Sequence, residues 1–207
     1  MPIRFSLSIL PVFARHPFTP VAARSDDTAV REVLCEGDDQ SAVRLLMAEY
    51  GDGLYGFMVQ MVGERALADD VYQTLWIQVL RDRGQYSGQG TVRSWLYSVA
   101  RNRCLDALKS QRRRERRFRP TGEPPDVADE NPDAVARLET RELSSSLEEC
   151  LQSLDPKTRV PLLLRFFEGM SFKEIARICG EKPGTLQARV ARALPLLRRC
   201  IESRGNE

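Results

Sequence analysis

The most chemically distinctive part of this sequence is a run of nine arginine and lysine residues between positions 101 and 119. Only Asp106 and Glu115 oppose them, so the stretch carries a net charge of +7. Clustered cationic side chains bind nucleic-acid phosphates, and an aromatic residue such as Trp95 just before them can stack on an unpaired base. We therefore favour nucleic acid as the partner. The alternative is an ordinary solvated helix with a basic tail, because clustered charge alone does not identify a ligand.

Residues that usually carry catalysis or bind metals are scarce in this chain. His16 is the single histidine, and the sequence has no nucleophile-elbow motif, no phosphate-loop motif and no obvious catalytic pair of carboxylates. We therefore expect no catalytic residue, no metal and no cofactor, and we do not expect an enzyme.

The five cysteines are odd in number and widely spaced, and no two of them form a C-x-x-C pair. This pattern predicts reduced thiols, as in a cytosol, and argues against a disulfide framework or a zinc site. Cys35, Cys104 and Cys179 occupy apolar positions of their segments, which predicts core packing rather than redox sensing.

The basic stretch belongs to a longer segment, 90–119, whose periodicity predicts one long helix. At about 100° per residue, its apolar residues gather on one side and most polar and basic residues gather on the other. Arg93 and Arg103 break this pattern because they lean into the apolar side, and Leu105 leans into the polar side. We expect the apolar side to pack inside a bundle.

Residues 28–114 as a whole predict an all-α bundle, because few β-branched alternations occur in them. Ser41 is a candidate cap for a helix that ends at Gly63, and the next helix is predicted from Leu67 to Arg83. That second helix presents a polar surface made of Asp69, Asp70, Gln73 and Gln78. Periodicity alone predicts only a solvated face there.

An acidic, proline-containing segment separates this bundle from the C-terminal part of the chain. Residues 120–150 carry a net charge of −7, whereas residues 151–207 carry a net charge of +5. A segment of this composition does not bury a core. We therefore expect residues 120–143 to form a flexible acidic linker.

Local signals after the linker predict a compact set of helices. Asp155 followed by Pro156 is a helix start, with a capping carboxylate before a proline in the first turn. Ser171 and Glu174 have the spacing of a capping box, which opens a second helix that ends at Gly180.

A third helix, predicted at 185–201, completes a helix-turn-helix arrangement, in which the last helix enters the major groove of DNA. Its outward residues are Thr185, Gln187, Ala188, Arg189 and Arg192. A small three-helix domain that binds only protein is the alternative. The capping box, the short turn and the outward arginines favour DNA.

The first 23 residues loosely imitate a secretory signal peptide, because Arg4 precedes an apolar stretch. Pro11 and Pro17 interrupt that stretch. We therefore interpret residues 1–27 as a disordered leader, or as the product of a start codon placed too far upstream. No apolar run approaches the ~20 residues needed to cross a bilayer, so no membrane insertion is expected.

Two blocks of residues carry a more specific signal. The first block contains AEYG at 48–51, ADDVYQ at 68–73 and WLYSVARN at 95–102. The second block contains FEGMSFKEIA at 167–176, followed by GTL at 184–186. In this order and spacing, the blocks resemble regions 2 and 4 of bacterial sigma factors of the extracytoplasmic-function group, which lack the middle domain of housekeeping sigma factors.

The resemblance implies an all-α fold of two small helical domains joined by the flexible acidic linker. Region 2 would span 28–119 after the leader at 1–27, and region 4 would span 144–207 after the linker at 120–143. The resemblance also implies a cytoplasmic subunit that directs core RNA polymerase to promoter DNA and contacts the β′ clamp and the β flap of the enzyme. An anti-sigma factor that covers the same surfaces is implied by the group.

The resemblance further assigns roles to three sets of residues. Core polymerase would bind Asp69, Asp70 and Gln73. The −10 element would be held by Tyr86, Ser87, Trp95, Arg101, Asn102, Lys109, Arg112 and Arg113. The −35 element would meet Thr185, Gln187, Ala188, Arg189 and Arg192. This sequence departs from the group at Thr74, where glutamate is usual, and in the recognition helix at Gln187, Ala188 and Ala191, so the promoter sequence is not carried over.

Two other functions stay open at this stage. One is a stand-alone helix-turn-helix regulator, usually dimeric, that never contacts polymerase. The other makes residues 28–115 a protein-interaction bundle and leaves the arginine run merely solvated. For a sigma factor, the segregation of charge predicts poor DNA binding by the free protein, because the acidic linker competes for the basic faces.

Overall fold

The computed structural model describes residues 39–82, 86, 90–117 and 146–204. Over those ranges the chain contains helices and no strand, as the predicted all-α fold requires. The leader, the linker and Cys35 lie outside the described residues. None of the helices within the described ranges is both long and apolar enough to cross a membrane.

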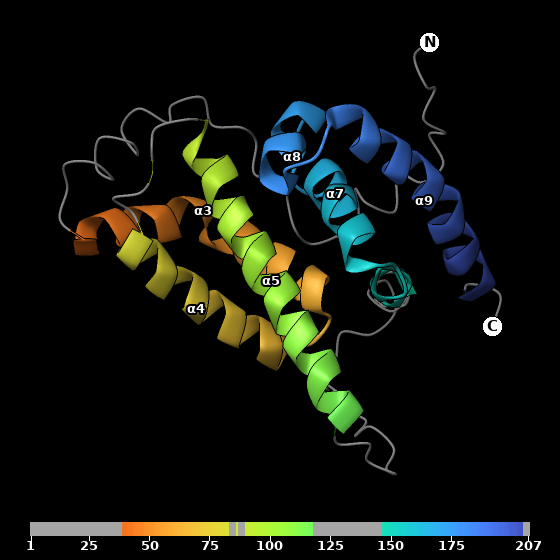
Figure 1. Ribbon diagram of the computed structural model, residues 1–207, viewed down its shortest axis with the longest axis horizontal. Coiled ribbons are helices and arrows are strands. Elements are labelled where there is room, and N and C mark those ends of the chain that lie inside the picture. The colour runs from red at the N-terminus through yellow and green to blue at the C-terminus, as the bar shows by residue number, and fades with distance from the viewer. Residues whose placement is uncertain (1–38, 83–85, 87–89, 118–145, 205–207) are drawn as a thin grey trace, which may run out of the picture.

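The helices form two groups, which Figure 1 shows on either side of the molecule. The N-terminal group consists of α3 (Asp39–Val62), α4 (Arg65–Asp82) and α5 (Val92–Arg117). The C-terminal group consists of a helix at 146–152, α7 (Pro156–Phe166), α8 (Phe172–Cys179) and α9 (Pro183–Arg204).

The N-terminal group is a bundle whose three helices bury apolar side chains against one another. Its fully buried side chains include Leu46, Leu54, Met58, Met61, Leu75 and Leu96. Helix α3 begins at Asp39, so Ser41 lies inside its first turn and is not the cap that the sequence predicted. A cap needs non-helical backbone, and exposed polar residues such as Gln40 continue a helix as readily as they precede one.

Helix α5 begins two residues later than predicted, for a local reason. Gly90 has a φ of 87°, in the left-handed region that glycine tolerates and a helix does not. The hydroxyl of Thr91 then accepts a hydrogen bond from the backbone N–H of Ser94 at 3.1 Å, as a helix cap does. The helix continues unbroken to Arg117, so it presents the basic run on regular helical backbone.

Both helix-start signals predicted in the C-terminal group are confirmed. The carboxylate of Asp155 accepts a hydrogen bond from the backbone N–H of Lys157 at 2.7 Å, and Pro156 occupies the first turn of α7. Ser171 and Glu174 make both hydrogen bonds of the capping box at the start of α8.

The turn between α8 and α9 is also close to the prediction. Gly180 has left-handed backbone with a φ of 67° and ends α8. Helix α9 starts at Pro183, two residues before the predicted Thr185, because proline is well tolerated in a first helical turn. Leu186, Val190, Ala193 and Leu197 of α9 are buried, as its periodicity predicted.

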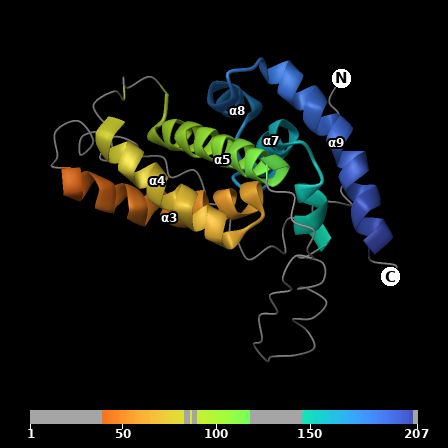
Figure 2. The same ribbon diagram turned by 60° about the horizontal axis from the view of Figure 1, so that its bottom comes forward.

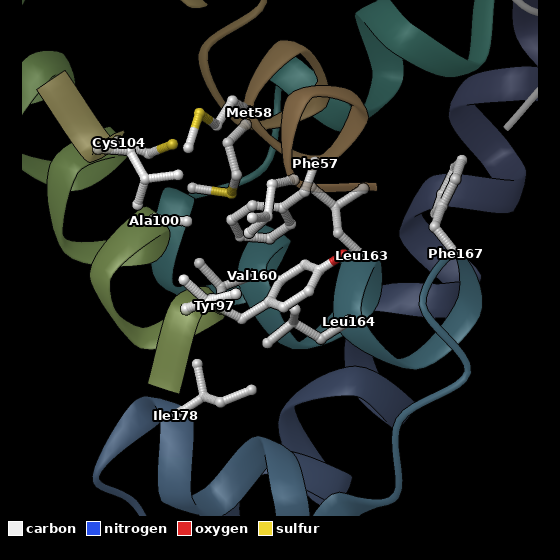
Figure 3. Packing of buried hydrophobic residues seen from close by; sticks show 14 of the residues in the cluster. Phe57, Met58, Tyr97, Ala100, Cys104, Val160, Leu163, Leu164, Phe167 and Ile178 are labelled. Carbon is white, nitrogen blue, oxygen red and sulfur yellow. The ribbon is translucent and has the colours of Figure 1, made fainter. Parts of the chain in front are cut away.

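The two groups of helices share one continuous apolar core, which the sequence did not predict. In both Figure 1 and Figure 2, α5 lies between the α3–α4 pair and the C-terminal group. Helix α5 contacts α8, and α3 contacts α7. Figure 3 shows Tyr97 of α5 among Phe57, Val160 and Leu164. Periodicity indicates which side of a helix is buried but not which element buries it.

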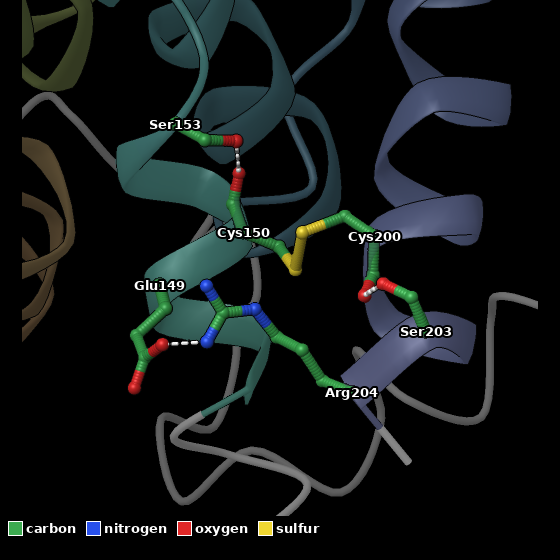
Figure 4. Close-up of a disulfide and its surroundings, with 6 residues drawn as sticks. All are labelled: Glu149, Cys150, Ser153, Cys200, Ser203 and Arg204. Carbon is green, nitrogen blue, oxygen red and sulfur yellow. Dashed lines mark hydrogen bonds and ion pairs between the residues drawn. A yellow bond between two sulfur atoms is a disulfide. The ribbon is translucent and has the colours of Figure 1, made fainter. Parts of the chain in front are cut away.

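A disulfide joins Cys150 in the helix at 146–152 to Cys200 in α9 (Figure 4). This contradicts the prediction of reduced thiols for these two residues. They are 50 positions apart in the sequence, and their Cα atoms come within 5.9 Å because α9 runs back beside the first helix of its group. Spacing along the chain carries no information on such a pair. An ion pair between Arg204 and Glu149 lies next to it.

Cys104 and Cys179 are the free cysteines of the described residues. Cys104 is fully buried in α5, and this burial raises the pKa of its thiol to about 12. Its predicted role in core packing is therefore confirmed, because a buried thiol of this kind is unreactive.

Breaking the disulfide should destabilise the protein. Closing a loop with a sequence separation of 50 is worth about 4 kcal/mol in the chain-entropy description. We expect Cys200→Ser to lower the free energy of unfolding in urea by up to about that amount. Reductant should have the same effect on the wild type and none on the variant. Cys179→Ser is the control and should keep the response to reductant. Equal midpoints for oxidised and reduced wild type would contradict the bond.

Candidate nucleic-acid interface

The outer side of α5 carries most of the aromatic and basic residues predicted to bind DNA. Trp95, Asn102, Lys109 and Arg113 fall on one line along the helix at about 100° per residue. Asn102, Lys109 and Arg113 are exposed, Trp95 is half-buried, and Arg112 is exposed beside the line. We call these five residues the outer line. It joins an aromatic surface to a cationic helix end, a combination that suits single-stranded nucleic acid.

Tyr86 supports the start of this line. Its side chain is buried, its hydroxyl donates a hydrogen bond to the carbonyl oxygen of Gly90 at 3.0 Å, and its ring centroid lies 5.5 Å from that of Trp95. The tyrosine thus holds the backbone at Gly90, just before α5, and packs against the indole. Ser87 lies outside the described residues.

Arg101 points away from the outer line, about 120° round the helix from Trp95. It is half-buried where α5 meets the C-terminal group, beside Cys179. Burial raises the pKa of the Cys179 thiol, and the charge of Arg101 opposes that rise. Its Nη1 donates to the side-chain oxygen of Asn102 at 2.9 Å. The structure therefore separates Arg101 from the other DNA candidates of α5.

The two arginines that broke the apolar pattern of α5 each have a partner on another element. The Nε of Arg103 donates to the side-chain oxygen of Gln78 on α4 at 2.5 Å. Arg93 reaches the C-terminal group, where its Nη2 donates to the backbone oxygen of Glu168 at 2.7 Å and to its carboxylate at 3.0 Å. Each arginine that interrupts the apolar side of α5 therefore makes a contact with another element.

Glu168 is the acceptor at the centre of the contact between the two groups. Only 6% of its surface is exposed, and Tyr97 donates a hydrogen bond to the same carboxylate oxygen, Oε2, at 2.5 Å. Burial raises the pKa of Glu168, while the hydrogen bond from Tyr97 and the charge of Arg93 oppose that rise. Burial and the charge of Glu168 raise the pKa of Tyr97 well above its ordinary value, so the phenol keeps its proton and donates. No sequence signal had singled out Glu168.

The outer face of α9 presents most of the residues predicted for a second DNA contact. Thr185, Ala188 and Arg192 are exposed, and Gln187 is half-buried. Thr185, Ala188 and Arg192 share one face in the first three turns of the helix, where a recognition helix meets base edges, whereas Gln187 lies about 100° or more round the helix from each of them.

Arg189 belongs to the same turns but is already engaged. Its two terminal nitrogens donate to the carboxylate of Glu181 at 2.9 and 2.5 Å, and Nη1 also donates to the backbone oxygen of Lys157 at 3.2 Å. The hydrogen bonds from Arg189 lower the pKa of Glu181 and, reciprocally, raise that of Arg189. The geometry holds this guanidinium against the turn before α9.

The polar surface predicted on α4 is exposed at Asp69, Asp70 and Gln73. The hydroxyl of Tyr55 donates to the carboxylate of Asp69 at 2.8 Å. Ile77 continues this surface one turn further and is 65% exposed, an unusual value for a large apolar residue. Thr74 turns its hydroxyl toward the backbone oxygen of Asp70 at 2.8 Å and adds no charge.

Comparison with known proteins places the two groups of helices in one family. Residues 46–114 match the model of sigma-70 region 2, and residues 144–197 match that of sigma-70 region 4. RNA polymerase sigma factor CarQ of Myxococcus xanthus is 32% identical over 168 residues, which cover 78% of this chain and 90% of CarQ. The ECF RNA polymerase sigma factor BldN of Streptomyces coelicolor is 31% identical over 186 residues, which cover 85% of this chain and 68% of BldN. The chain belongs to the extracytoplasmic-function group of the sigma-70 family.

Solved structures share the fold of this sigma factor. CnrH, solved in complex with the cytosolic domain of CnrY, aligns with a TM-score of 0.62 at 22% identity, over 86% of this chain and 97% of CnrH. The sigma factor RpoE of Bartonella quintana, solved with the anti-sigma factor NepR, aligns with a TM-score of 0.61 at 18% identity, over 79% of this chain and 96% of RpoE.

Arg159 ties region 4 of the sigma factor to region 2. It is only 3% exposed, and its Nη1 donates to the backbone oxygen of Met61 at the end of α3 at 2.5 Å. Its Nη2 donates to the backbone oxygens of Gln152 and Leu154 at 2.7 and 3.0 Å. Burial lowers the pKa of Arg159 to about 10, so the group stays charged at neutral pH. A cation is favoured where helix α3 ends, because its last carbonyl groups lack helical partners.

Removing this guanidinium should destabilise the sigma factor. Arg159→Leu removes the donor from one buried and two partly buried backbone oxygens, so we expect the free energy of unfolding to fall by about 3 kcal/mol. Arg198→Leu is the matched control, because Arg198 is exposed and pairs only with Glu202 one turn away. The control should change stability by less than about 0.5 kcal/mol. Urea unfolding followed by circular dichroism compares the two, and equal losses would contradict the structural role of Arg159.

Proposed function

We propose that this sigma factor binds core RNA polymerase, brings it to promoters and opens the DNA there, without catalysing a reaction itself. The observation that carries the proposal is the separation of three exposed surfaces over regions 2 and 4: the polar row of α4, the outer line of α5 and the start of α9. The proposed domains are a leader at 1–27, region 2 at 28–119, an acidic linker at 120–143 and region 4 at 144–207. The proposed location is the cytoplasm.

The polar row of α4 is the proposed docking surface for core polymerase. Asp69, Asp70 and Gln73 would bind the β′ clamp, and Ile77 would lose its exposed apolar surface in the same contact. Burial of apolar surface favours association, and only its surplus over the entropy and desolvation costs of binding appears as affinity. An interface with an apolar anchor beside charged groups gains both affinity and orientation. Region 4 would contact the β flap.

The outer line of α5 is the proposed site for the −10 element as a single strand. Trp95, backed by Tyr86, offers a surface on which a base can stack, at about 1–3 kcal/mol per base. Asn102 can hydrogen-bond a base edge, while Lys109, Arg112 and Arg113 neutralise phosphates. Ser87 is proposed to assist from the preceding loop, and Arg101 from the inner side of the helix.

The start of α9 is the proposed site for the −35 element as a duplex. Arg192 can read guanine or hold a phosphate, and Ala188 can touch a thymine methyl group. Thr185 and Gln187 supply further hydrogen-bonding groups. Arg189 can bind a DNA phosphate only after its hydrogen bonds to Glu181 have broken. DNA binding by Arg189 therefore exchanges a carboxylate partner for a phosphate partner.

The linker makes these two DNA contacts cooperative. Once one region is bound, the other is held nearby at a high effective concentration, so two modest contacts give a tight complex. Because CnrH and RpoE were solved with CnrY and with the anti-sigma factor NepR, we further propose that an anti-sigma factor binds this protein and covers the same surfaces.

Transcription with purified components tests the proposed function. The protein is mixed with core RNA polymerase and a promoter library, and both co-elution and the positions of new transcripts are measured. A sigma factor co-elutes and creates promoter-dependent starts. A stand-alone helix-turn-helix regulator binds duplex DNA tightly by itself and does neither.

Charge reversal on α4 should weaken the complex with polymerase. Asp70→Arg places a cation in the proposed docking row, and we expect core polymerase to bind at least about tenfold more weakly, which is ~1.4 kcal/mol. Glu202→Arg introduces the same change of charge on exposed α9 and should leave the affinity within about twofold. Fluorescence anisotropy of labelled protein titrated with core polymerase measures both. Equal affinities would place the docking surface elsewhere.

Charge reversal at the end of α5 should impair promoter opening. We expect Arg112→Glu with Arg113→Glu to reduce open complexes about tenfold and to lower the salt slope of single-strand binding by roughly 1.4, for two lost phosphate contacts. Arg44→Glu with Arg65→Glu, at exposed positions of α3 and α4, matches the change of charge. Permanganate footprinting of the holoenzyme on a promoter detects opening. Intact opening in the first pair would show that the arginine run is merely solvated.

A further inference from the structure

The inner side of α5 carries a second line of DNA-compatible groups, and region 4 covers it. Arg93, Tyr97 and Arg101 are spaced four residues apart and therefore lie on one side of the helix. The side chain of Arg93 is 12% exposed, Tyr97 is 1% exposed and Arg101 is half-buried. We call these three residues the inner line. It is distinct from the outer line, which region 4 leaves open.

The two arginines of the inner line are incompletely paired. The Nε–H groups of both Arg93 and Arg101 are buried, and neither finds an acceptor among the described residues. A buried donor without an acceptor costs about 1–3 kcal/mol, so such groups usually indicate a missing ligand or a functional strain. Both orphaned donors lie on the same face of one helix.

Region 4 places carboxylates near these arginines, from the turns that follow α7 and α8. Glu168, after α7, accepts hydrogen bonds from Arg93 and Tyr97. Glu181, after α8, is close enough to Arg101 for the charge of Arg101 to contribute to its lowered pKa. Glu174 adds negative charge near Arg93. In this closed arrangement, anions of the protein itself occupy the inner line.

We propose that the inner line is a covered binding site for the phosphates of single-stranded promoter DNA, in which Glu168 of region 4 stands in for phosphate until the two regions separate. This inference rests on the proposed function, and it adds Arg93 and Tyr97 to Arg101 as phosphate ligands, together with a regulatory contact.

A phosphate satisfies the inner line better than the carboxylate does. The carboxylate of Glu168 takes one hydrogen bond from Arg93, through Nη2, and leaves Nε–H without an acceptor. The two non-bridging oxygens of a backbone phosphate accept from Nε–H and an Nη–H of one guanidinium at once, and either oxygen can also accept from the hydroxyl of Tyr97. The two occupants exclude each other, since DNA reaches Arg93 only after Glu168 has left.

This competition predicts weak DNA binding by the free protein through a local contact, in addition to the competition expected from the acidic linker. Separation of the regions also exposes the apolar core that they share, so loss of the Glu168 contact raises the separated population, and a contact made by another molecule raises it further. Binding of polymerase to both regions supplies such a contact. The inner line would therefore become available at the step at which DNA must be held.

Binding of an oligonucleotide to the full-length free protein tests the inference. The probe is a fluorescein-labelled 20-nucleotide oligothymidine, and anisotropy is measured over a range of salt concentrations. Glu168→Ala removes the anion of region 4 and should bind the probe about tenfold more tightly, with a salt slope steeper by about 0.7 per phosphate gained. The matched control, Glu202→Ala, makes the same change of charge at an exposed residue of α9 and should stay within about twofold of the wild type.

A second substitution tests whether the higher affinity of Glu168→Ala for the probe comes from the inner line. Adding Arg93→Gln to Glu168→Ala should return the affinity to within about twofold of the wild type. Equal affinities for Glu168→Ala and Glu202→Ala overturn the proposal, and so does a gain that survives Arg93→Gln. If circular dichroism shows that Glu168→Ala does not fold, Glu168→Gln, which keeps the side-chain volume, is compared with Glu202→Gln by the same criteria.

The oligothymidine experiment can fail while the proposed function holds, and the reverse is also possible. The oligothymidine measurement contains no polymerase, so failure to co-elute with polymerase would not change it. Conversely, wild-type transcription together with an unchanged affinity in Glu168→Ala would overturn the covered site alone.

Discussion

The structure depends on the burial of α5 from two sides. Helices α3 and α4 cover one side, and region 4 covers another, so few residues of α5 are exposed before its last turns, where residues 112–117 are all exposed. Burying an arginine at such a junction is costly unless every charge meets a partner. The contact of Arg93 with Glu168 is sustained because Tyr97 donates to the same carboxylate and the backbone oxygen of Glu168 accepts a further hydrogen bond.

This arrangement couples the surfaces of the protein to one another. Region 2 and region 4 share an apolar core, and Arg159 adds a buried hydrogen-bonded tie from α7 to the end of α3. A partner that binds better to separated regions shifts the population toward them by its difference in affinity for the two states. Under the proposed function, polymerase is that partner, and its binding is then linked to the exposure of DNA ligands on α5.

Much of the local structure follows from short stretches of sequence. The capping residues Asp155 and Ser171 accept hydrogen bonds from backbone groups two or three positions away, so the sequence alone predicts the helix starts that they make. Ser41 shows the limit of this logic, because a polar residue near a helix start is compatible with either side of the boundary. The disulfide between Cys150 and Cys200 marks a larger limit, since two distant cysteines meet only when the helices around them pack.

The sequence by itself determined the all-α class, the two blocks of family motifs and the positions that could bind polymerase and DNA. Helical periodicity and capping involve residues only a few positions apart, so both can be recognised in the sequence without knowledge of the fold. The tertiary structure alone decided which of these groups are free. It left Lys109, Arg113 and Arg192 in solvent, and it turned Arg93 and Arg101 toward carboxylates of region 4. Periodicity records which side of a helix is buried, but the partner that buries it comes from residues some 70 positions away, as Glu168 does for Arg93.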